Sequence, residues 1–329
     1  MESNVITMVG MSGSGKTCFV YAMYDYMQLT HNGFSFTAED PDVDLDLMNG
    51  WSSIAFEGKW PPGTMETTNY DFFVQYATKP IMNFSWCDYR GGVLTSRSDE
   101  SDKKEFLQRL KESSCLIITI GADTVKEILE GNMRKTLELK ILNSLIKRFE
   151  VENTRRIPII FALTKADLYT KDEQGKLLDL IKNYFNSLYT EGSGWMFGIV
   201  PVTLGRFEKT ENPRDIIGEV APKNIHIPVM FFVASVLKEK AAEIQGKLND
   251  IRINRSQYRA SLETAGEQSF WSKILNGDRS KMIQKNLSSL DEEEKNILTQ
   301  IADIEASLKS MSSMFKVCKI FFEGKPVDF

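Results

Sequence analysis

The sequence predicts a three-layer α/β/α domain with a mostly parallel sheet, followed by an antiparallel α-helical coiled-coil hairpin. Two observations lead to this fold class. Up to about residue 235, helical stretches alternate with short runs such as CLIITI and IPIIFAL, which are apolar throughout, as in parallel strands buried on both faces. From about residue 237, apolar residues follow a four-three spacing along two arms of similar length, which is typical of a coiled coil.

The change of texture sets the expected domain boundaries. We place the α/β domain at residues 1–236, the hairpin at 237–312 with its tip near 267–280, and a returning segment at 313–329. The apolar tail FKVCKIFF is expected to be a strand or docking segment that packs on the α/β domain. The alternative for the two arms is a pair of single helices that meet in a dimer.

The expected elements alternate along the first domain. Between them, residues 31–69 are rich in Gly, Pro, Asp and Thr, and we interpret them as one long functional or disordered connection. The expected strands span residues 5–9, 70–77, 81–87, 115–120, 157–163 and 197–202. The expected helices span residues 16–29, 99–112, 133–149 and 171–189.

The heptad pattern of each arm has one break. Arg255 interrupts the first arm and Glu294 interrupts the second. Pro228 suits the first turn of a helix, so we expect the last helix of the α/β domain to run straight into the first arm. The tip contains Phe270 and Trp271 among basic residues, and it either caps its own coil or contacts a partner or membrane surface.

Composition excludes several classes of function and site. The chain has 329 residues, 42% hydrophobic and 26% charged, and its net charge of −5 gives no overall attraction for nucleic acid or anionic membranes. The four cysteines have no paired spacing and the two histidines, His31 and His226, are far apart, so neither a disulfide framework nor a histidine metal site is expected. No signal peptide or transmembrane run is visible, which favours a cytoplasmic protein.

Residues 10–17, GMSGSGKT, follow an apolar strand and open a helix. This is the context that a phosphate-binding loop requires, because glycines let successive N–H groups turn toward one anion at a helix N-terminus. Lys16 would reach the β- and γ-phosphates and Thr17 would ligate Mg²⁺. The expected nucleotide contacts here are Gly10, Ser12, Gly13, Ser14, Gly15, Lys16, Thr17 and Cys18.

The motif ALTKAD, residues 162–167, ends another apolar strand and resembles the base-reading motif of the P-loop GTPases, Asn/Thr-Lys-x-Asp. Thr164, Lys165 and Asp167 match it. A carboxylate at Asp167 accepts two hydrogen bonds from the N1–H and N2–H₂ edge of guanine, and adenine lacks that pair of donors. The resemblance implies a P-loop NTPase fold and a GTPase that binds GTP and GDP with Mg²⁺.

Three further elements fit the same family. Asp88 and Gly91 in DYRGG match Asp-x-x-Gly, so the resemblance implies that Asp88 holds Mg²⁺ and that the Gly91 N–H meets the γ-phosphate. A threonine before the strand at 70–77 would complete the Mg²⁺ shell. Thr67 and Thr68 fit its usual position best, and Thr64 remains open. Thr203 and Leu204 in PVTLG match the element that supports the base.

One departure concerns catalysis. Many family members have a glutamine after Asp-x-x-Gly that orients the attacking water, whereas this chain has Gly92. We therefore expect slow intrinsic hydrolysis, with the missing group supplied by Arg90, by Arg97, or by a partner or second copy in trans. Arg90 and Arg97 are otherwise ordinary solvated arginines of the loop.

The expected function is a Mg²⁺-dependent molecular switch that hydrolyses GTP and relays its nucleotide state to an effector or regulatory protein. The hairpin is a candidate contact for that partner, and a homodimer through the GTPase domain or the coil is also considered. The combination of DYRGG, WPPGT and a hairpin is similar to bacterial double-GTPase proteins associated with conflict or defence systems. Two alternatives are a GTP-binding structural scaffold and a membrane-associated, dynamin-like GTPase.

Overall fold

The computed structural model describes residues 4–63, 67–88, 100–152, 155–266 and 277–328. The chain divides into two compact units, one formed by Met1–Phe232 with Ser312–Phe329 and the other by Val233–Met311. The boundaries expected from the sequence lie after residues 236 and 312.

In the described residues of the first unit, nine strands form one sheet in the order β11-β10-β7-β6-β5-β1-β4-β3-β2. The central strands β4, β1, β5, β6 and β7 are parallel to one another, and the outer strands pair antiparallel. Their bounds are β1 Val5–Gly10, β2 Phe34–Ala38, β3 Thr68–Tyr76, β4 Lys79–Asp88, β5 Cys115–Gly121, β6 Ile159–Thr164, β7 Met196–Pro201, β10 Lys319–Phe322 and β11 Lys325–Pro326. A separate two-stranded ribbon pairs β8 (Thr203–Phe207) with β9 (Gly218–Lys223).

Helices cover both faces of this sheet, which confirms the predicted α/β class. Their bounds are α1 Lys16–Gln28, α2 Pro41–Ala55, α3 Glu100–Glu112, α4 Ala122–Leu129, α5 Met133–Glu152 and α6 Lys171–Tyr184, with 3-10 turns at Ala166–Leu168, Asn186–Tyr189 and Met314–Val317. Neighbouring residues of β4 show the two layers. Cys87 packs into the core formed with α3, α4, α5 and α6, whereas Trp86 stacks on Phe19 of α1.

The interpretation of residues 31–69 as one long connection is wrong, because this range contains β2 and α2. Phe34 and Phe36 alternate into the core while β2 pairs antiparallel with β3. The Asp40 side chain accepts a hydrogen bond of 2.9 Å from the Asp42 N–H, and Pro41 occupies the first turn of α2, so the helix has both of its usual start signals.

Several other elements differ from their expected bounds. Helix α4 and the β8–β9 ribbon were not predicted, and the helix expected over residues 171–189 ends at Tyr184, before the 3-10 turn. In the C-terminal segment, β10 covers only Lys319–Phe322 of the expected apolar strand and pairs antiparallel with β7, and the short strand β11 that follows it was not predicted. These differences all lie at short elements, where tertiary pairing rather than local pattern decides the structure.

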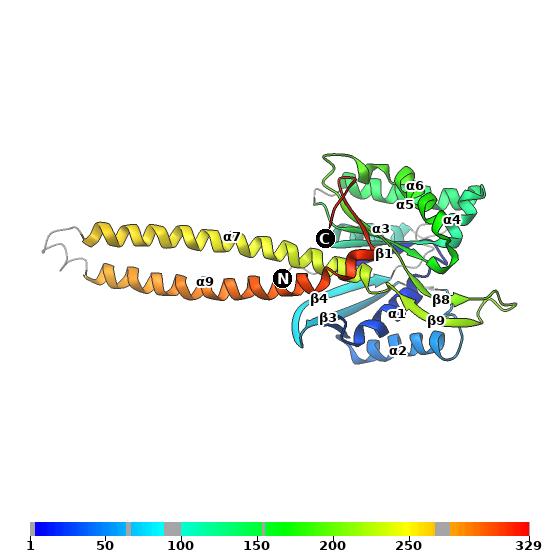
Figure 1. Ribbon diagram of the computed structural model, residues 1–329, viewed down its shortest axis with the longest axis horizontal. Helices are drawn as coiled ribbons and strands as arrows, with labels where there is room; N and C mark the ends of the chain where they lie inside the picture. Colours follow the sequence, from blue (N-terminus) through cyan, green and yellow to red (C-terminus); the bar gives the residue numbers. More distant parts are fainter. Residues whose placement is uncertain (1–3, 64–66, 89–99, 153–154, 267–276, 329) are drawn as a thin grey trace. The chain divides into compact units, whose positions relative to one another are not determined.

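The second unit is built from two long helices that run antiparallel (Figure 1). Helix α7 spans Ile227–Gly266, beginning in the first unit with Pro228 in its first turn, and α9 spans Gly277–Met311. The guanidinium of Arg255 donates to both Asp291 and Glu294, so the two residues that break the heptad pattern contact each other. In the part of the chain that the structure describes, every helix is too short or too polar to span a lipid bilayer.

The two histidines, distant in sequence, both stack on one tyrosine in the first unit. The Tyr26 ring stacks on His31 at a centroid distance of 3.9 Å and on His226 at 4.7 Å. Because His226 immediately precedes α7 and His31 follows α1, the stack ties the start of α7 to the end of α1.

Candidate functional site

The glycine-rich loop leaves β1 at Gly10 and enters α1 at Lys16. Gly13 and Gly15 have φ values of 78° and 87°, a left-handed conformation that glycine adopts without strain. A Cβ on Gly10 would lie 1.9 Å from Thr119 Oγ1, so no larger residue fits there. The loop therefore needs its glycines for backbone conformation and for close packing.

Two threonines from neighbouring strands hold this loop in place. The hydroxyls of Ser14 and Thr119 are 2.8 Å apart, and the Thr164 hydroxyl donates a 2.7 Å hydrogen bond to the Ser14 carbonyl. All three side chains are buried. Thr119 was not predicted as a site residue. Its only sequence signal is a hydroxyl within the otherwise apolar run CLIITI.

The Lys16 side chain is only 6% exposed. Its ammonium donates to the carbonyls of Gly10 at 3.0 Å and Met11 at 3.4 Å. Burial lowers the pKa of Lys16, and the nearby charge of Asp88 opposes that shift. A buried cation held by two carbonyls inside a curved loop is suited to attracting an anion.

Asp88, at the end of β4, lies beside Thr17, the second residue of α1. The Thr17 hydroxyl donates a 2.9 Å hydrogen bond to Asp88 Oδ2, while Asp88 Oδ1 has no hydrogen-bond partner among the described residues. Asp88 is fully buried, and burial raises its pKa against the opposing effects of Lys16 and Thr17. A buried carboxylate oxygen without a partner, next to a hydroxyl, fits a hard cation such as Mg²⁺ and its water shell.

The threonines expected to complete the Mg²⁺ shell have different positions. Thr68 opens β3 and lies directly opposite Asp88 in the antiparallel register of β3 and β4. Thr67 precedes it and is half-buried. Thr64 lies outside the described residues, as do Arg90, Gly91, Gly92 and Arg97 in the stretch 89–99.

The proposed base-reading residues surround the end of β6. Lys165 has a left-handed backbone with φ 56°, unusual for a residue other than glycine. The following turn is fastened by the Ala166 N–H, which donates to the Val202 carbonyl at 3.0 Å. The Thr203 hydroxyl donates to Asp167 Oδ1 at 2.7 Å, so the matched Thr203 orients the matched Asp167.

Lys165 also pairs with a residue that the sequence analysis did not identify. Its ammonium donates a hydrogen bond to Asp123 at the start of α4. Asp123 comes from the strand-end stretch GAD after β5, a position where ligand-contacting residues gather in open α/β sheets.

The remaining predicted contacts are less enclosed. Ser12 is exposed, and Leu204 is half-buried at the start of β8. Burial raises the pKa of the Cys18 thiol to about 12, so Cys18 stays protonated at neutral pH and lacks thiolate reactivity.

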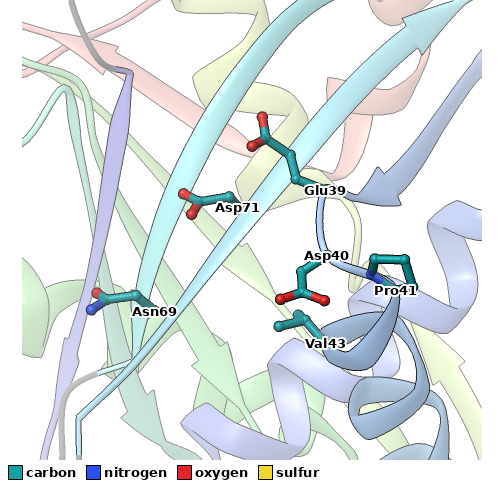
Figure 2. A pocket seen from close by; sticks show the side chains of 6 residues that line it. All are labelled: Glu39, Asp40, Pro41, Val43, Asn69 and Asp71. Atoms are coloured by element: carbon teal, nitrogen blue, oxygen red, sulfur yellow. The ribbon is translucent and has the colours of Figure 1, made fainter.

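A pocket lies at the start of α2, beside β3, and Figure 2 shows its lining. The side chains of Glu39, Asp40 and Asp71 line it together with Pro41, Val43 and Asn69. Three carboxylates would repel a phosphate, so this pocket does not fit a nucleotide. No group of three or more potential metal ligands from His, Cys, Asp and Glu occurs among the described residues.

The family model described as Double-GTPase 2 matches residues 4–193. A search of curated proteins found no match. Among solved structures, the signal recognition particle receptor SRb-GTP/SRX complex from Chaetomium thermophilum is 13% identical, with a TM-score of 0.38, covering 62% of this chain and 91% of that one.

Two further solved structures are similar over shorter shares of their own length. The Sar1-type GTP-binding protein of Encephalitozoon cuniculi in complex with GDP is 9% identical, with a TM-score of 0.28, covering 56% of this chain and 61% of that one. The GTPase-like domain of S. cerevisiae Ski7 bound to GTP is 18% identical, with a TM-score of 0.34, covering 64% of this chain and 47% of that one.

Proposed function

The chain belongs to the Double-GTPase 2 family and is a P-loop GTPase, and from this premise we propose that it is a Mg²⁺-dependent switch with slow intrinsic hydrolysis. The observation that carries the proposal is the cluster of Lys16, Thr17 and Asp88. In this cluster, Lys16 is a buried cation and Asp88 is a buried carboxylate, and Asp88 Oδ1 lacks a hydrogen-bond partner among the described residues. That combination is costly in a folded protein unless a charged ligand completes it.

On the phosphate side, the loop would bind the β- and γ-phosphates of GTP. Lys16 would exchange its contacts with the Gly10 and Met11 carbonyls for phosphate oxygens, and the N–H groups at the start of α1 would add the positive end of the helix. The clamp of Ser14 by Thr119 and Thr164 supports this role, since it prearranges the loop before the ligand arrives.

On the metal side, Thr17 and Asp88 would hold Mg²⁺, with Thr67 or Thr68 joining when the γ-phosphate is present. A bound Mg²⁺ neutralises charge on the β- and γ-phosphates during phosphoryl transfer. The position of Thr68 opposite Asp88 supports it as a candidate. Thr64 stays a candidate from its sequence position alone.

On the base side, Asp167 would accept the two donors of the guanine edge, and Lys165 would pack its stem along the base. The hydrogen bond from Thr203 supports this role because it orients the Asp167 carboxylate, and Leu204 would cover the base. Guanine would then be selected over adenine, which lacks the two donors and leaves the acceptor positions of Asp167 that face the base without partners.

Hydrolysis is proposed to be slow because Gly92 stands where many P-loop GTPases have a water-orienting glutamine. Arg90 is the candidate in cis for the missing charge, and a partner protein or second copy is the candidate in trans. The nucleotide state would then persist long enough to be relayed to an effector, with the helical hairpin as a candidate contact surface.

The test is a binding assay with fluorescent GTP, GDP and ATP at several Mg²⁺ concentrations, paired with a hydrolysis time course over a range of protein concentrations. Guanine-only binding that strengthens with Mg²⁺, with slow turnover, supports the switch. A turnover rate per molecule that rises with protein concentration would indicate a catalytic group donated by a second copy. Preference for ATP would contradict the role of Asp167.

A further inference from the structure

The short stretch Gly58–Trp60, between α2 and β3, is attached to the β8–β9 ribbon. Lys59 forms an antiparallel bridge with Asp215 in the connection between β8 and β9. The backbone completes it, since the Trp60 N–H donates to the Arg214 carbonyl and the Ile216 N–H to the Gly58 carbonyl, each at 2.8 Å. This is a miniature strand pairing, although 156 residues separate Lys59 from Asp215.

Side chains strengthen the attachment on both sides of the bridge. The Trp60 ring packs edge-on against Phe207 of β8, with ring centroids 5.0 Å apart and planes at 82°. Lys59 forms an ion pair with Asp215. Gly58 has φ +65°, and a Cβ there would lie 3.3 Å from the Ile216 carbonyl oxygen. The Trp60–Phe207 contact contributes more to the stability of this attachment than the Lys59–Asp215 ion pair, because an exposed ion pair contributes little.

The ribbon that receives Trp60 begins at the base-reading end of the site. Strand β8 opens with Thr203, whose hydroxyl donates to Asp167, and closes four residues later with Phe207. A continuous set of contacts therefore runs from Asp167 through Thr203 and β8 to Trp60.

In the other direction, Trp60 leads toward the Mg²⁺ end of the site. The chain continues from Trp60 to Thr67 and Thr68, and Thr68 enters β3 opposite Asp88. The N–H groups of Phe56, Glu57 and Lys59 donate to carbonyls of α2, so α2 holds the start of this connection. The attachment adds a further fixed point at Trp60, eight positions before Thr68, and a fixed point close in sequence lowers the entropy lost when Thr67 or Thr68 takes up its place.

We propose that Trp60 and Phe207 are positioning residues that hold Thr67 and Thr68 ready for the γ-phosphate and couple them to the guanine-reading end. The inference rests on the proposed function, because it takes Asp167 as the base reader and Thr67 or Thr68 as the γ-phosphate sensor. In the proposed function, Thr67 or Thr68 joins the Mg²⁺ shell only when the γ-phosphate is present. Loss of the attachment therefore weakens GTP binding and leaves GDP binding nearly unchanged.

The experiment measures dissociation rates of fluorescent GDP and of a fluorescent non-hydrolysable GTP analogue, in the full-length chain with Mg²⁺. The variants are Trp60→Ala, Phe207→Ala and their combination. The control is Phe56→Ala, an aromatic of the same connection that is 85% exposed. We expect each single variant to speed release of the GTP analogue roughly tenfold while GDP release changes less than about twofold.

The double variant distinguishes loss of the Trp60–Phe207 contact from a general destabilisation of the fold. Because both rings belong to one contact, Trp60→Ala with Phe207→Ala should release the GTP analogue no faster than either single variant. A Trp60→Phe variant should recover most of the effect, and Phe56→Ala should match the wild-type chain. Unfolding temperatures without nucleotide verify that each variant is folded, and Lys59→Asp with Asp215→Lys offers a surface variant that preserves the ion pair.

Equal acceleration of GDP and GTP-analogue release in Trp60→Ala, or an effect of Phe56→Ala as large, would overturn the inference while leaving guanine binding intact. Failure of the wild-type chain to bind either guanine nucleotide would instead contradict the proposed function. The two failures are therefore distinguishable in one data set.

Discussion

Each unit of this protein buries a carboxylate, and the two are treated differently. In the first unit, Asp88 is fully buried, and one of its oxygens has no hydrogen-bond partner among the described residues. In the second unit, Glu294 is 8% exposed, and its two oxygens accept hydrogen bonds from Arg252 and Arg255. Asp88 therefore has a hydrogen-bond partner on one oxygen only, whereas Glu294 has a partner on each oxygen.

The difference distinguishes the proposed ligand site from a structural ion pair. A buried carboxylate whose hydrogen bonds are incomplete costs free energy that folding alone does not recover, and this cost is the reason for proposing a ligand at Asp88. The paired charge at Glu294 needs no ligand. A polar residue at one core position of a coiled coil fixes the register of its helices, and we interpret the Arg255–Glu294 contact in this way.

The largest expected effect comes from removing a charge from the proposed nucleotide site of the first unit. Lys16→Ala should weaken GTP and GDP binding by about 4 kcal/mol, roughly 1,000-fold, because it removes two charge-assisted hydrogen bonds to phosphate. Fluorescent nucleotide titration with Mg²⁺ measures the loss. Lys140→Ala, an exposed lysine of α5, is the matched control and should bind like the wild-type chain. Undiminished binding by Lys16→Ala would contradict the proposed phosphate site.

The next effect comes from removing Glu294, the buried carboxylate of the helical hairpin. Glu294→Ala should destabilise the helical hairpin by about 2 kcal/mol, because two partly exposed arginines lose the buried carboxylate that they share. Thermal unfolding of the full chain, followed by the helix signal in circular dichroism, measures this effect. Glu293→Ala removes an exposed neighbour and should change little.

Replacing both members of the pair sharpens the interpretation. Arg255→Leu with Glu294→Leu restores an apolar heptad and should recover the lost stability, at the cost of a unique register. Disulfide cross-linking between engineered cysteines on α7 and α9 would report register. A double variant that is stable and still cross-links in one register only would show that the ion pair does not set it.

Sequence patterns located the parts of the molecule that carry local signals. The six predicted strands all occur within a few residues of their expected bounds, and the buried strands β5 and β6 are the runs that are apolar throughout. The glycine-rich loop was visible because its residue order and strand–loop–helix context are set by backbone geometry over eight residues. The two heptad breaks were also visible, although not their contact.

Other features could not be predicted because they depend on contacts between distant segments. The Ser14–Thr119 and Lys165–Asp123 contacts join residues 105 and 42 positions apart. Helix α2 is a different case. Its start signals, Asp40 and Pro41, are present in the sequence, and Gly50 together with the surrounding turn-forming composition concealed them. Gly50 has a tertiary reason, since a Cβ there would lie 2.5 Å from the Tyr21 ring.

The third effect tests whether the ligand proposed at Asp88 is a metal ion. Asp88→Asn should cost about 2 kcal/mol of Mg²⁺-dependent nucleotide affinity, roughly 30-fold, by removing a charge that orients the Mg²⁺ shell. Without nucleotide and Mg²⁺, the variant should be no less stable than the wild-type chain at pH 7, because burial raises the pKa of Asp88 and disfavours its charged form. Affinity measured with Mg²⁺ and with EDTA, alongside urea unfolding, checks both parts. A destabilised variant with unchanged Mg²⁺ dependence would make Asp88 a structural residue like Glu294.

The smallest effect concerns His226, a half-buried residue whose Nδ1 atom is buried and whose ring is kept neutral. Burial, followed by the nearby His31, lowers the pKa of His226 to about 4, so His226 is uncharged in the folded chain at neutral pH. An unfolded histidine has a pKa near 6.5 and takes up a proton as the pH falls, whereas the folded one does so only near pH 4. The unfolded state therefore binds more protons between these values, and stability falls with decreasing pH.

Between pH 7 and pH 5 this linkage should remove about 1–2 kcal/mol from the free energy of unfolding. His226→Phe keeps a ring against Tyr26 and should flatten that part of the pH profile, measured by urea unfolding of the full chain with tryptophan fluorescence. His226 thus extends the comparison to a third case, in which a buried polar group is accommodated by losing its charge rather than by gaining a partner or a ligand. An unchanged slope in His226→Phe would assign the acid sensitivity to other groups, and the stack around Tyr26 would then be only a packing contact.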